Sequence, residues 1–370
     1  SGGKKSKLGS FYTPKNLVVD SLTTVLTNHS TDILLDPCCG SGQYLLVAAK
    51  QFELSIDRLV GFDNDPIAIQ LAKINLLLHF KEYNFCPRLY HVNTLSESEL
   101  NQLRFFDNVL DDITVIATNP PWGNIRKKEH YEGEVKSNEM FSMFIERAIQ
   151  LLPIGGKASF IIPESFLSIK IHADIRFLLL SQCKIINIEL LGRPFTNVFT
   201  SVIRIDFIKE ITSNDLIMVN GFPKIKPSHV LLNKTYIFDI HHNEIDRQLI
   251  DKFYQIKHLT LENNAQWALG IVTGDNKSYV VTHKNRTRPI ITGPDISKYK
   301  ITLTKYIIFK PKEFNQIAKD TLYKTEKLVY KFISNKLIFA YDNKGLYMLN
   351  SANALIPNMP GISIKVTLAF

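Results

Sequence analysis

The chain has 370 residues and a formal net charge of +9, and with 45% hydrophobic and 21% charged residues it is long enough for two globular domains with sizeable cores. No apolar run reaches the roughly 18 residues that a membrane-spanning helix needs, and the basic start SGGKKSKLGS lacks the apolar segment of a secretory signal, so neither is expected. The four cysteines show neither metal-ligand spacing nor a disulfide framework, so we expect a cytoplasmic protein with no metal site and no membrane partner.

Up to about residue 120, short apolar runs alternate with helix-like patterns. Strands are predicted at 32–37, 58–63, 88–93 and 114–119. Residues 42–52 and 66–80 have the apolar spacing of helices, and Pro66 fits the first turn of the second one. Helices in these places can connect parallel strands.

The same alternation continues to about residue 208. The run 140–152 predicts a strong helix, and further strands are predicted at 157–163, 184–191 and 200–208. Strands that alternate with helices at this frequency indicate an α/β fold with a mostly parallel, doubly wound sheet.

After residue 208 the composition changes, and we predict an α/β domain over 1–215 and a smaller, β-rich domain over 216–370. The runs YIIFK, KLVYKFI and KLIFAYD in the second part are typical of strands. Residues 211–370 hold 22 Lys and Arg against 12 Asp and Glu, a balance of +10, whereas residues 1–210 hold 22 against 23. This asymmetry favours a polyanionic partner for the second domain, although a bias toward Lys, Asn and Ile would give the same charge.

A glycine-rich turn follows the first predicted strand in LLDPCCGSGQYLL (34–46). Gly40 and Gly42 leave room for a ligand near the backbone and the start of the next helix. The turn lacks the third glycine of a dinucleotide site and the Lys-Ser/Thr of a P-loop. Asp36 at the strand's end suits a cationic ligand such as S-adenosylmethionine better than a pyrophosphate. The alternative is an ordinary turn between a strand and a helix.

Two polar residues follow the next two predicted strands. Asp63, about 20 residues beyond the glycine turn, can accept hydrogen bonds from both ribose hydroxyls of an adenosine-bearing cofactor, or it is a simple loop carboxylate. Asp65 is expected to cap the helix that begins at Pro66. Asn93 either contacts an adenine edge or forms a turn.

The fourth predicted strand ends in Asn119-Pro120-Pro121-Trp122. Prolines cannot donate to a sheet, so they leave backbone carbonyls unpaired at the edge where α/β sheets bind ligands. The Asn119 amide oxygen and the Pro120 carbonyl provide two acceptors for one amino group, and Trp122 provides a flat apolar face. These groups predict a pocket for a planar base with an exocyclic amino group, with a simple Pro-Pro turn as the alternative.

The ordered motifs resemble the class I S-adenosylmethionine-dependent amino-methyltransferases, and within them the γ-class N6-adenine DNA methyltransferases. The motifs are GSFYTPKNLVVDSL (9–22), DPCCGSG (36–42), FDND (62–65) and NPPW (119–122). The resemblance implies a Rossmann-like domain in which Thr13 contacts the methionine carboxylate and Asp36 its ammonium. It further implies that Asp63 contacts the ribose, that Asn93 contacts the adenine, and that the cofactor site also includes Tyr12, Cys38, Gly40 and Gly42.

The resemblance extends to both sides of the target base and to the C-terminal domain. RPFTNVFTSVIRIDF (193–207) is similar to the family segment whose aromatic ring stacks on the base, which implies Phe195, with Phe199 as the alternative and core packing as a third possibility. Three later segments, 266–281, 291–299 and 326–358, look like the target-recognition domain of type IIG restriction–modification enzymes. Relatives of this kind continue beyond residue 370, so we expect a fragment of a longer chain.

The sequence therefore predicts a site-specific DNA methyltransferase of a restriction–modification system. Asn119, Pro120 and Trp122 are the expected catalytic residues, acting on N6 of an adenine flipped out of double-stranded DNA. A nuclease domain or subunit could complete the system. The alternatives are a protein-glutamine or RNA-base methyltransferase, and a non-catalytic DNA-binding specificity component.

Overall fold

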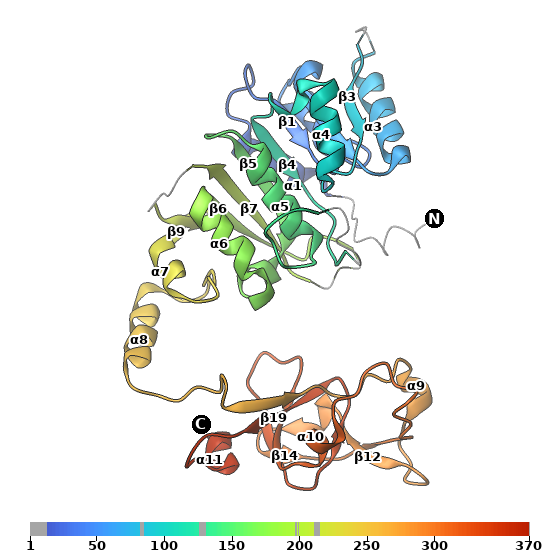
Figure 1. Cartoon of the computed structure of the whole chain (residues 1–370), viewed down its shortest axis with the longest axis vertical. Helices are drawn as coiled ribbons and strands as arrows, with labels where there is room; N and C mark the ends of the chain where they lie inside the picture. Colours follow the sequence, from blue (N-terminus) through green and yellow to red (C-terminus); the bar gives the residue numbers. More distant parts are fainter. Residues whose placement is uncertain are drawn as a thin grey trace. The chain divides into compact units, whose positions relative to one another are not determined.

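The computed structural model describes residues 13–81, 85–125, 131–196, 198, 200–210 and 215–369 (Figure 1). The chain divides into two compact units, residues 1–247 and 248–370. In the described part of the chain, no helix is long and apolar enough to cross a membrane.

The first unit is built on one large sheet. Its strands in chain order are β1 (Leu34–Asp36), β2 (Leu59–Asp63), β3 (Arg88–His91), β4 (Val115–Thr118), β5 (Lys157–Pro163), β6 (Cys183–Gly192), β7 (Val202–Lys209), β8 (Ile217–Val219) and β9 (Phe222–Ile225). In space they follow the order β3-β2-β1-β4-β5-β7-β6-β8-β9. The first five strands are parallel, and β7 lies antiparallel between β5 and β6.

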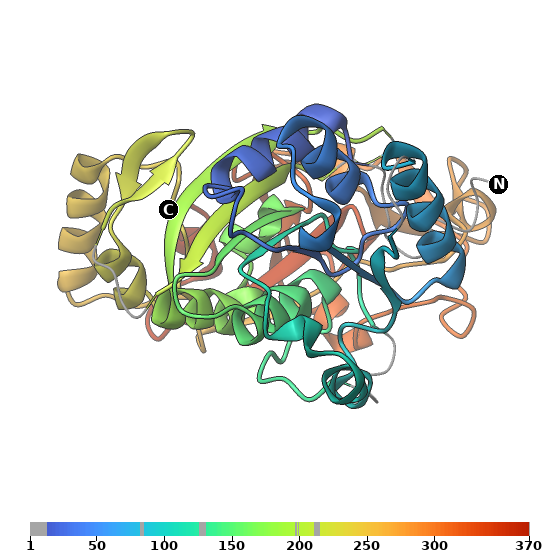
Figure 2. The ribbon, with the colours of Figure 1, turned by 90° about the horizontal axis from the view of Figure 1, so that it is seen from above.

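Helices cover both faces of this sheet (Figure 2). They are α1 (Lys15–Val25), α2 (Gln43–Gln51), α3 (Pro66–His79), α4 (Glu97–Phe106), α5 (Met140–Leu151) and α6 (Ala173–Gln182). Apolar residues of α1–α3 pack in one core cluster, and those of α4–α6 pack mainly in a second. Because both faces are covered, central strands such as β4 are buried along their length, and β4 is apolar up to its last residue, Thr118. The predicted α/β class with a mostly parallel, doubly wound sheet is confirmed.

The start of α3 follows the predicted capping pattern. Asp65 accepts a hydrogen bond from the Ile67 backbone N–H over 2.9 Å, and Pro66 occupies the first helical position. This fixes the direction of the chain as it leaves β2, at the edge where the candidate site lies.

The first unit extends past the predicted boundary at residue 215. β8 pairs in parallel with β6 through Asn187↔Met218 and Ile188↔Val219. Farther along, the buried Arg176 guanidinium donates to the Thr235 carbonyl over 2.6 Å. The segment after β9 contains α7 (Pro227–Leu232), and α8 (Glu244–Gln255) spans the division between the units.

The second unit is β-rich, as predicted. Its strands are β10 (Ala265–Ala268), β11 (Val280–Val281), β12 (Arg288–Ile291), β13 (Ile296–Ser297), β14 (Lys300–Ile301), β15 (Lys305–Ile307), β16 (Lys327–Lys331), β17 (Phe339–Asp342), β18 (Tyr347–Met348) and β19 (Ala352–Pro357), with the short helices α9 (Asn276–Tyr279), α10 (Asp320–Lys324) and α11 (Ile364–Ala369). Two four-stranded sheets, β10-β19-β16-β17 and β11-β15-β12-β18, enclose its apolar core. A buried ion pair of 2.5 Å joins Lys327 on β16 to Asp342 on β17.

Candidate active site

Asp36 ends β1 at the carboxyl edge of the sheet and is 2% exposed. Its Oδ1 accepts hydrogen bonds from the Thr118 hydroxyl over 2.7 Å and from the Cys38 backbone N–H over 3.3 Å. Burial raises the pKa of the Asp36 carboxyl to about 7, even though both hydrogen bonds oppose the shift. A cation beside this carboxylate would restore its ionised form.

The glycine turn after β1 is pinned to the end of β2. The Gly40 N–H donates to Asp63 Oδ2 over 2.8 Å, and Asp63 Oδ1 accepts from the Asp65 N–H over 2.9 Å. Both glycines have left-handed φ values, +54° at Gly40 and +81° at Gly42. A Cβ on Gly42 would lie 3.2 Å from the Ala72 Cβ, whereas a Cβ on Gly40 would meet no atom within 4 Å.

These features fit the predicted cofactor. Burial raises the pKa of Asp63 as well as that of Asp36, so two carboxylates stand at one edge of the sheet without full hydration. The open space above Gly40 adjoins them. A ligand with a cationic amino acid moiety matches this set of groups.

Asn93 makes local hydrogen bonds at the end of β3. Its Oδ1 accepts from the Leu95 N–H over 3.1 Å, and its own N–H donates to Glu99 Oε2 over 2.7 Å. This is the turn-forming role that the sequence offered as the alternative. A contact with the cofactor adenine stays a prediction.

Asn119 directly follows β4 and lies beside Thr13, 106 residues earlier in the chain. Its Nδ2 donates to the Thr13 hydroxyl over 3.0 Å. Its Oδ1 is buried, and no hydrogen-bond partner for it occurs among the described residues. The structure therefore places an unused acceptor, at the predicted position, next to the buried Pro120.

Trp122 and Phe195, which the sequence predicts on the two sides of the target base, lie next to each other and are buried, with 9% and 6% of their surfaces exposed. Their ring centroids are 5.4 Å apart with an interplanar angle of 83°, so the rings meet edge to face. The Trp122 indole N–H donates to the Ile161 carbonyl over 3.3 Å, which ties this ring to β5. The other predicted residues, Tyr12 and the alternative Phe199, lie outside the described residues.

Thr118 is the main site residue that the sequence reasoning missed. Its hydroxyl donates to Asp36 and lies 3.0 Å from Cys38 Sγ, so it links the end of β4 to the glycine turn. Thr94, whose hydroxyl donates to the Pro37 carbonyl over 2.6 Å, holds the same turn from the end of β3. A hydroxyl residue at or just beyond the end of a strand was the available signal.

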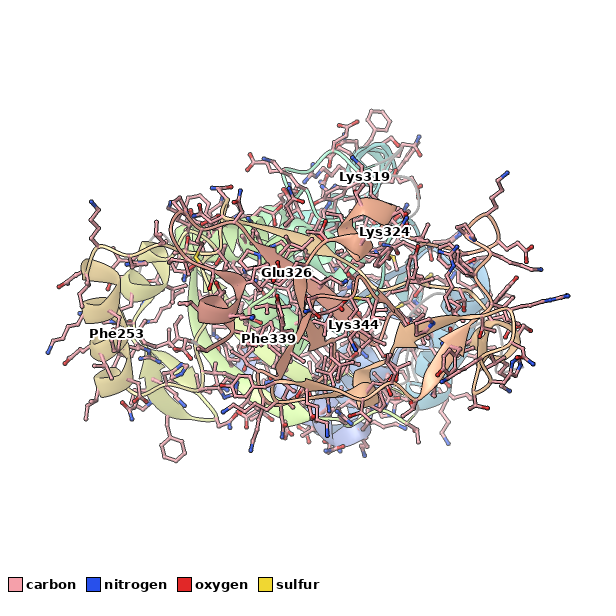
Figure 3. The ribbon with its side chains drawn as sticks, turned by 90° about the horizontal axis from the view of Figure 1, so that it is seen from below. Phe253, Lys319, Lys324, Glu326, Phe339 and Lys344 are labelled. Atoms are coloured by element: carbon pink, nitrogen blue, oxygen red, sulfur yellow. The ribbon has the colours of Figure 1, made fainter. Side chains whose placement is uncertain are left out.

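The second unit carries the basic charge of the chain. Residues 248–370 hold 18 Lys and Arg against 8 Asp and Glu. Figure 3 shows three exposed lysines of this unit: Lys319 directly precedes α10, Lys324 is its last residue, and Lys344 follows β17. Lys324 is ion-paired with Asp320 over 2.5 Å. Across the described part of both units, no group of three His, Cys, Asp or Glu side chains is placed to hold a metal ion.

Comparison with protein families tests the resemblance. The model of the N-6 DNA methylase family matches residues 2–255, and that of the TaqI-like C-terminal specificity domain matches residues 288–370. The chain belongs to the N-6 DNA methylase family. The match to this family is followed along the chain by the match to a specificity domain. Together they confirm the predicted enzyme class, an adenine-specific DNA methyltransferase of the restriction–modification kind.

Individual relatives agree with the N-6 DNA methylase assignment. The type II methyltransferase M.VspI of Vibrio sp. (strain 343) is 26% identical over 308 residues, which are 80% of this chain and 72% of the relative. The methylase subunit of the type I restriction enzyme EcoEI of Escherichia coli is 24% identical over 209 residues, 52% of this chain and 41% of the subunit.

One solved structure is similar in fold to nearly the whole chain. It is a nuclease-deletion mutant of the type ISP restriction–modification enzyme LlaGI in complex with a DNA substrate mimic, with a TM-score of 0.63 and 12% identity. The match covers 94% of this chain and 48% of that one. This chain thus spans about two fifths to three quarters of the length of these relatives.

Proposed function

We propose that this chain transfers a methyl group from S-adenosylmethionine to N6 of a flipped adenine in double-stranded DNA. The observation that supports this most directly is the buried Asn119 Oδ1, which has no hydrogen-bond partner among the described residues at the carboxyl edge of the sheet. A buried acceptor without a donor costs about 1–3 kcal/mol, and an incoming amino group would remove that cost.

The two acceptors of the motif act on the geometry of the target nitrogen. The N6 lone pair of adenine is delocalised into the ring, so the free amino group is a weak nucleophile. Hydrogen bonds from its two N–H groups to Asn119 Oδ1 and the Pro120 carbonyl would favour a tetrahedral nitrogen. Its lone pair would then be aligned for in-line displacement, and alignment of this kind can supply much of the rate enhancement.

Trp122 offers its face to the flipped base. Stacking on an aromatic ring contributes about 1–3 kcal/mol per base, which offsets part of the cost of flipping. Trp122 is held by its hydrogen bond to Ile161, whereas Phe195 lies in the irregular segment between β6 and β7. We therefore infer that Phe195 is the ring that moves from its edge-on contact when a base enters.

The turn residues would hold the cofactor. S-adenosylmethionine, when bound, supplies an electrophilic methyl group on its sulfonium. Asp36 would contact its ammonium and Asp63 its ribose, while Cys38, Gly40 and Gly42 shape the turn against it. Asn93 would contact the adenine and Thr13 the methionine carboxylate, and Tyr12 would also belong to the cofactor site.

The second unit would hold the DNA. Its excess of lysines and arginines supports contacts with phosphates, which position the duplex, while its loops would read base edges. The relatives include subunits and nuclease-bearing enzymes, which supports a nuclease domain or subunit as a further partner. A cytoplasmic location, in the compartment that holds the DNA, belongs to the same proposal.

The test is transfer of a tritiated methyl group to mixed-sequence duplex DNA, with the product identified by mass spectrometry as N6-methyladenine. Asn119→Ala should lower the rate by at least about a hundredfold, the size of the effect when one preorganised hydrogen-bonding group is removed from an active site. Asn101→Ala, on the exposed surface of α4, is the matched control and should keep the wild-type rate.

Three other results would favour an alternative function or remove the role of Asn119. Label in RNA or protein extracts but not in DNA would favour the alternative substrates. Cofactor binding without transfer to any of these would favour a non-catalytic specificity component. Full activity of Asn119→Ala would remove the central role given to this amide.

A further inference from the structure

The contact between Asn119 and Thr13 has a direction. The amide donates through Nδ2 to the Thr13 hydroxyl oxygen over 3.0 Å, and Thr13 itself is 6% exposed. Thr13 stands just before α1, whereas Asn119 follows β4, so the bond joins two elements that are distant in sequence.

The direction of this hydrogen bond matters because one end of an amide accepts hydrogen bonds and the other end donates them. The oxygen end accepts hydrogen bonds, whereas the nitrogen end presents two donors. A target amino group also presents N–H groups, so the nitrogen end would oppose it. The two ends are almost equal in size, so packing alone does not select one, and a hydrogen-bond partner must do so.

We propose that Thr13 is a positioning residue that fixes the orientation of the Asn119 amide. By accepting from Nδ2, its hydroxyl turns Oδ1 toward the target amino group. This inference rests on the proposed function and adds a role for Thr13 beyond the cofactor contact that the family resemblance implies. It also accounts for why Oδ1, rather than Nδ2, is the end of the amide that has no partner within the described part of the chain.

The test uses two substitutions in the full chain. Thr13→Val keeps the shape of the side chain but removes the acceptor, and Thr13→Ser keeps the hydroxyl. At saturating DNA and cofactor, we expect kcat to fall about tenfold or more in Thr13→Val, because a buried donor is left unpaired and the amide can turn. Thr13→Ser should retain most of the activity and of the affinity for S-adenosylmethionine. Thr13→Val also loses the hydroxyl that would contact the cofactor carboxylate, so its Kd for S-adenosylmethionine should rise, and kcat is compared at saturating cofactor to keep this weaker binding out of the result.

Two controls separate this role from folding and from a general effect of valine. Thr23→Val, on the exposed side of α1, should keep wild-type activity, and all three variants should melt within a few degrees of the wild type. In an Asn119→Asp background, followed under single-turnover conditions, Thr13→Val should lose most of its effect, because the two carboxylate oxygens are equivalent.

Three results would overturn the inference. These are an unchanged kcat in Thr13→Val, a loss that saturating cofactor fully restores, and an equal loss in the Asn119→Asp background. If the wild type and Thr23→Val transfer no methyl to DNA, the proposed function fails together with this inference. If they do transfer it, only the role of Thr13 is in question.

Discussion

Gly40 and Gly42 differ in what surrounds them, although both have positive φ values. A residue with a side chain at either position would destabilise the fold by about 1–2 kcal/mol, because the left-handed conformation is strained for it. Only Gly42 faces a close neighbour, Ala72, and only Gly40 borders open space at the predicted cofactor site. We therefore expect Gly40 to serve the ligand, whereas Gly42 allows the close packing of α2 against α3.

This difference predicts that an alanine at Gly42 mainly lowers stability, whereas an alanine at Gly40 mainly weakens cofactor binding. Gly42→Ala should lower the free energy of unfolding by about 2–4 kcal/mol, since crowding adds to the backbone strain. Gly40→Ala should lower it by about 1–2 kcal/mol but weaken S-adenosylmethionine binding more than tenfold. Urea unfolding and calorimetric titration measure the two effects, and wild-type affinity in Gly40→Ala would place the cofactor elsewhere.

Asp36 predicts a pH dependence of cofactor binding. Burial raises the pKa of its carboxyl to about 7 in the free protein, and burial also raises that of Asp63. Below this pKa the carboxyl is protonated and loses its attraction for an ammonium, so the affinity should fall as pH decreases, by up to about tenfold per unit. The ligand's own amino group, with a pKa near 7.7–8.0, remains charged in this range.

Titrations between pH 5.5 and 7.5 measure this effect. Asp36→Asn should bind more weakly at pH 7.5 and show a flatter profile, with any remaining slope due to Asp63. A wild-type affinity that is constant over the range would show that Asp36 does not meet the cationic group.

At the scale of elements, β8 and the chain that follows it complete the first unit. β8 covers the outer edge of β6, and Ile217, Val219 and Phe238 belong to the core cluster beneath it. The composition of the sequence changes near residue 208, which suggested a domain boundary there. The pairing of β8 with β6 joins residues about 30 positions apart, so no local sequence pattern shows that β8 belongs to the first unit.

Two fragments test this division. A fragment of residues 1–247 should fold cooperatively and bind S-adenosylmethionine. One that ends at residue 215 exposes the edge of β6 and loses buried core residues, so we expect aggregation or a markedly lower melting temperature. Equal stability and cofactor affinity of the two fragments would restore the earlier boundary.

At the scale of the whole molecule, the charge is divided between the units. Residues 248–370 carry a balance of +10, from 18 Lys and Arg and 8 Asp and Glu, so the rest of the chain is nearly neutral. Under the proposed function, the cofactor and the DNA would therefore meet parts of the chain with different net charge.

This division predicts two different responses to salt. If the second unit contacts about six phosphates, the affinity of the full chain for duplex DNA should fall about a thousandfold between 50 and 200 mM salt. Cofactor affinity, which depends on a buried carboxylate, should change far less. Fluorescence anisotropy and calorimetry over the same salt series measure both, and a flat DNA response would contradict the phosphate contacts.

The sequence predicted where β1 to β7 lie along the chain, because strand ends carry local signals such as Asp-Pro and Asn-Pro-Pro, but it did not predict their order in the sheet. It did not predict α4 or α6. Nor could it show that Asn93 turns back on its own backbone, or that the Thr118 hydroxyl bridges two strands. These contacts depend on how separate elements meet in three dimensions.

The antiparallel β7 also has a consequence for synthesis on the ribosome. β5 ends at Pro163, but its outer neighbour in the sheet is β7, which is complete only at Lys209. β6 emerges first and yet belongs one place farther out, so it has no sheet to join until β7 is made. We therefore expect the hairpin of β6 and β7 to dock as one late step that brings Phe195 with it, so that the proposed base pocket is completed only then.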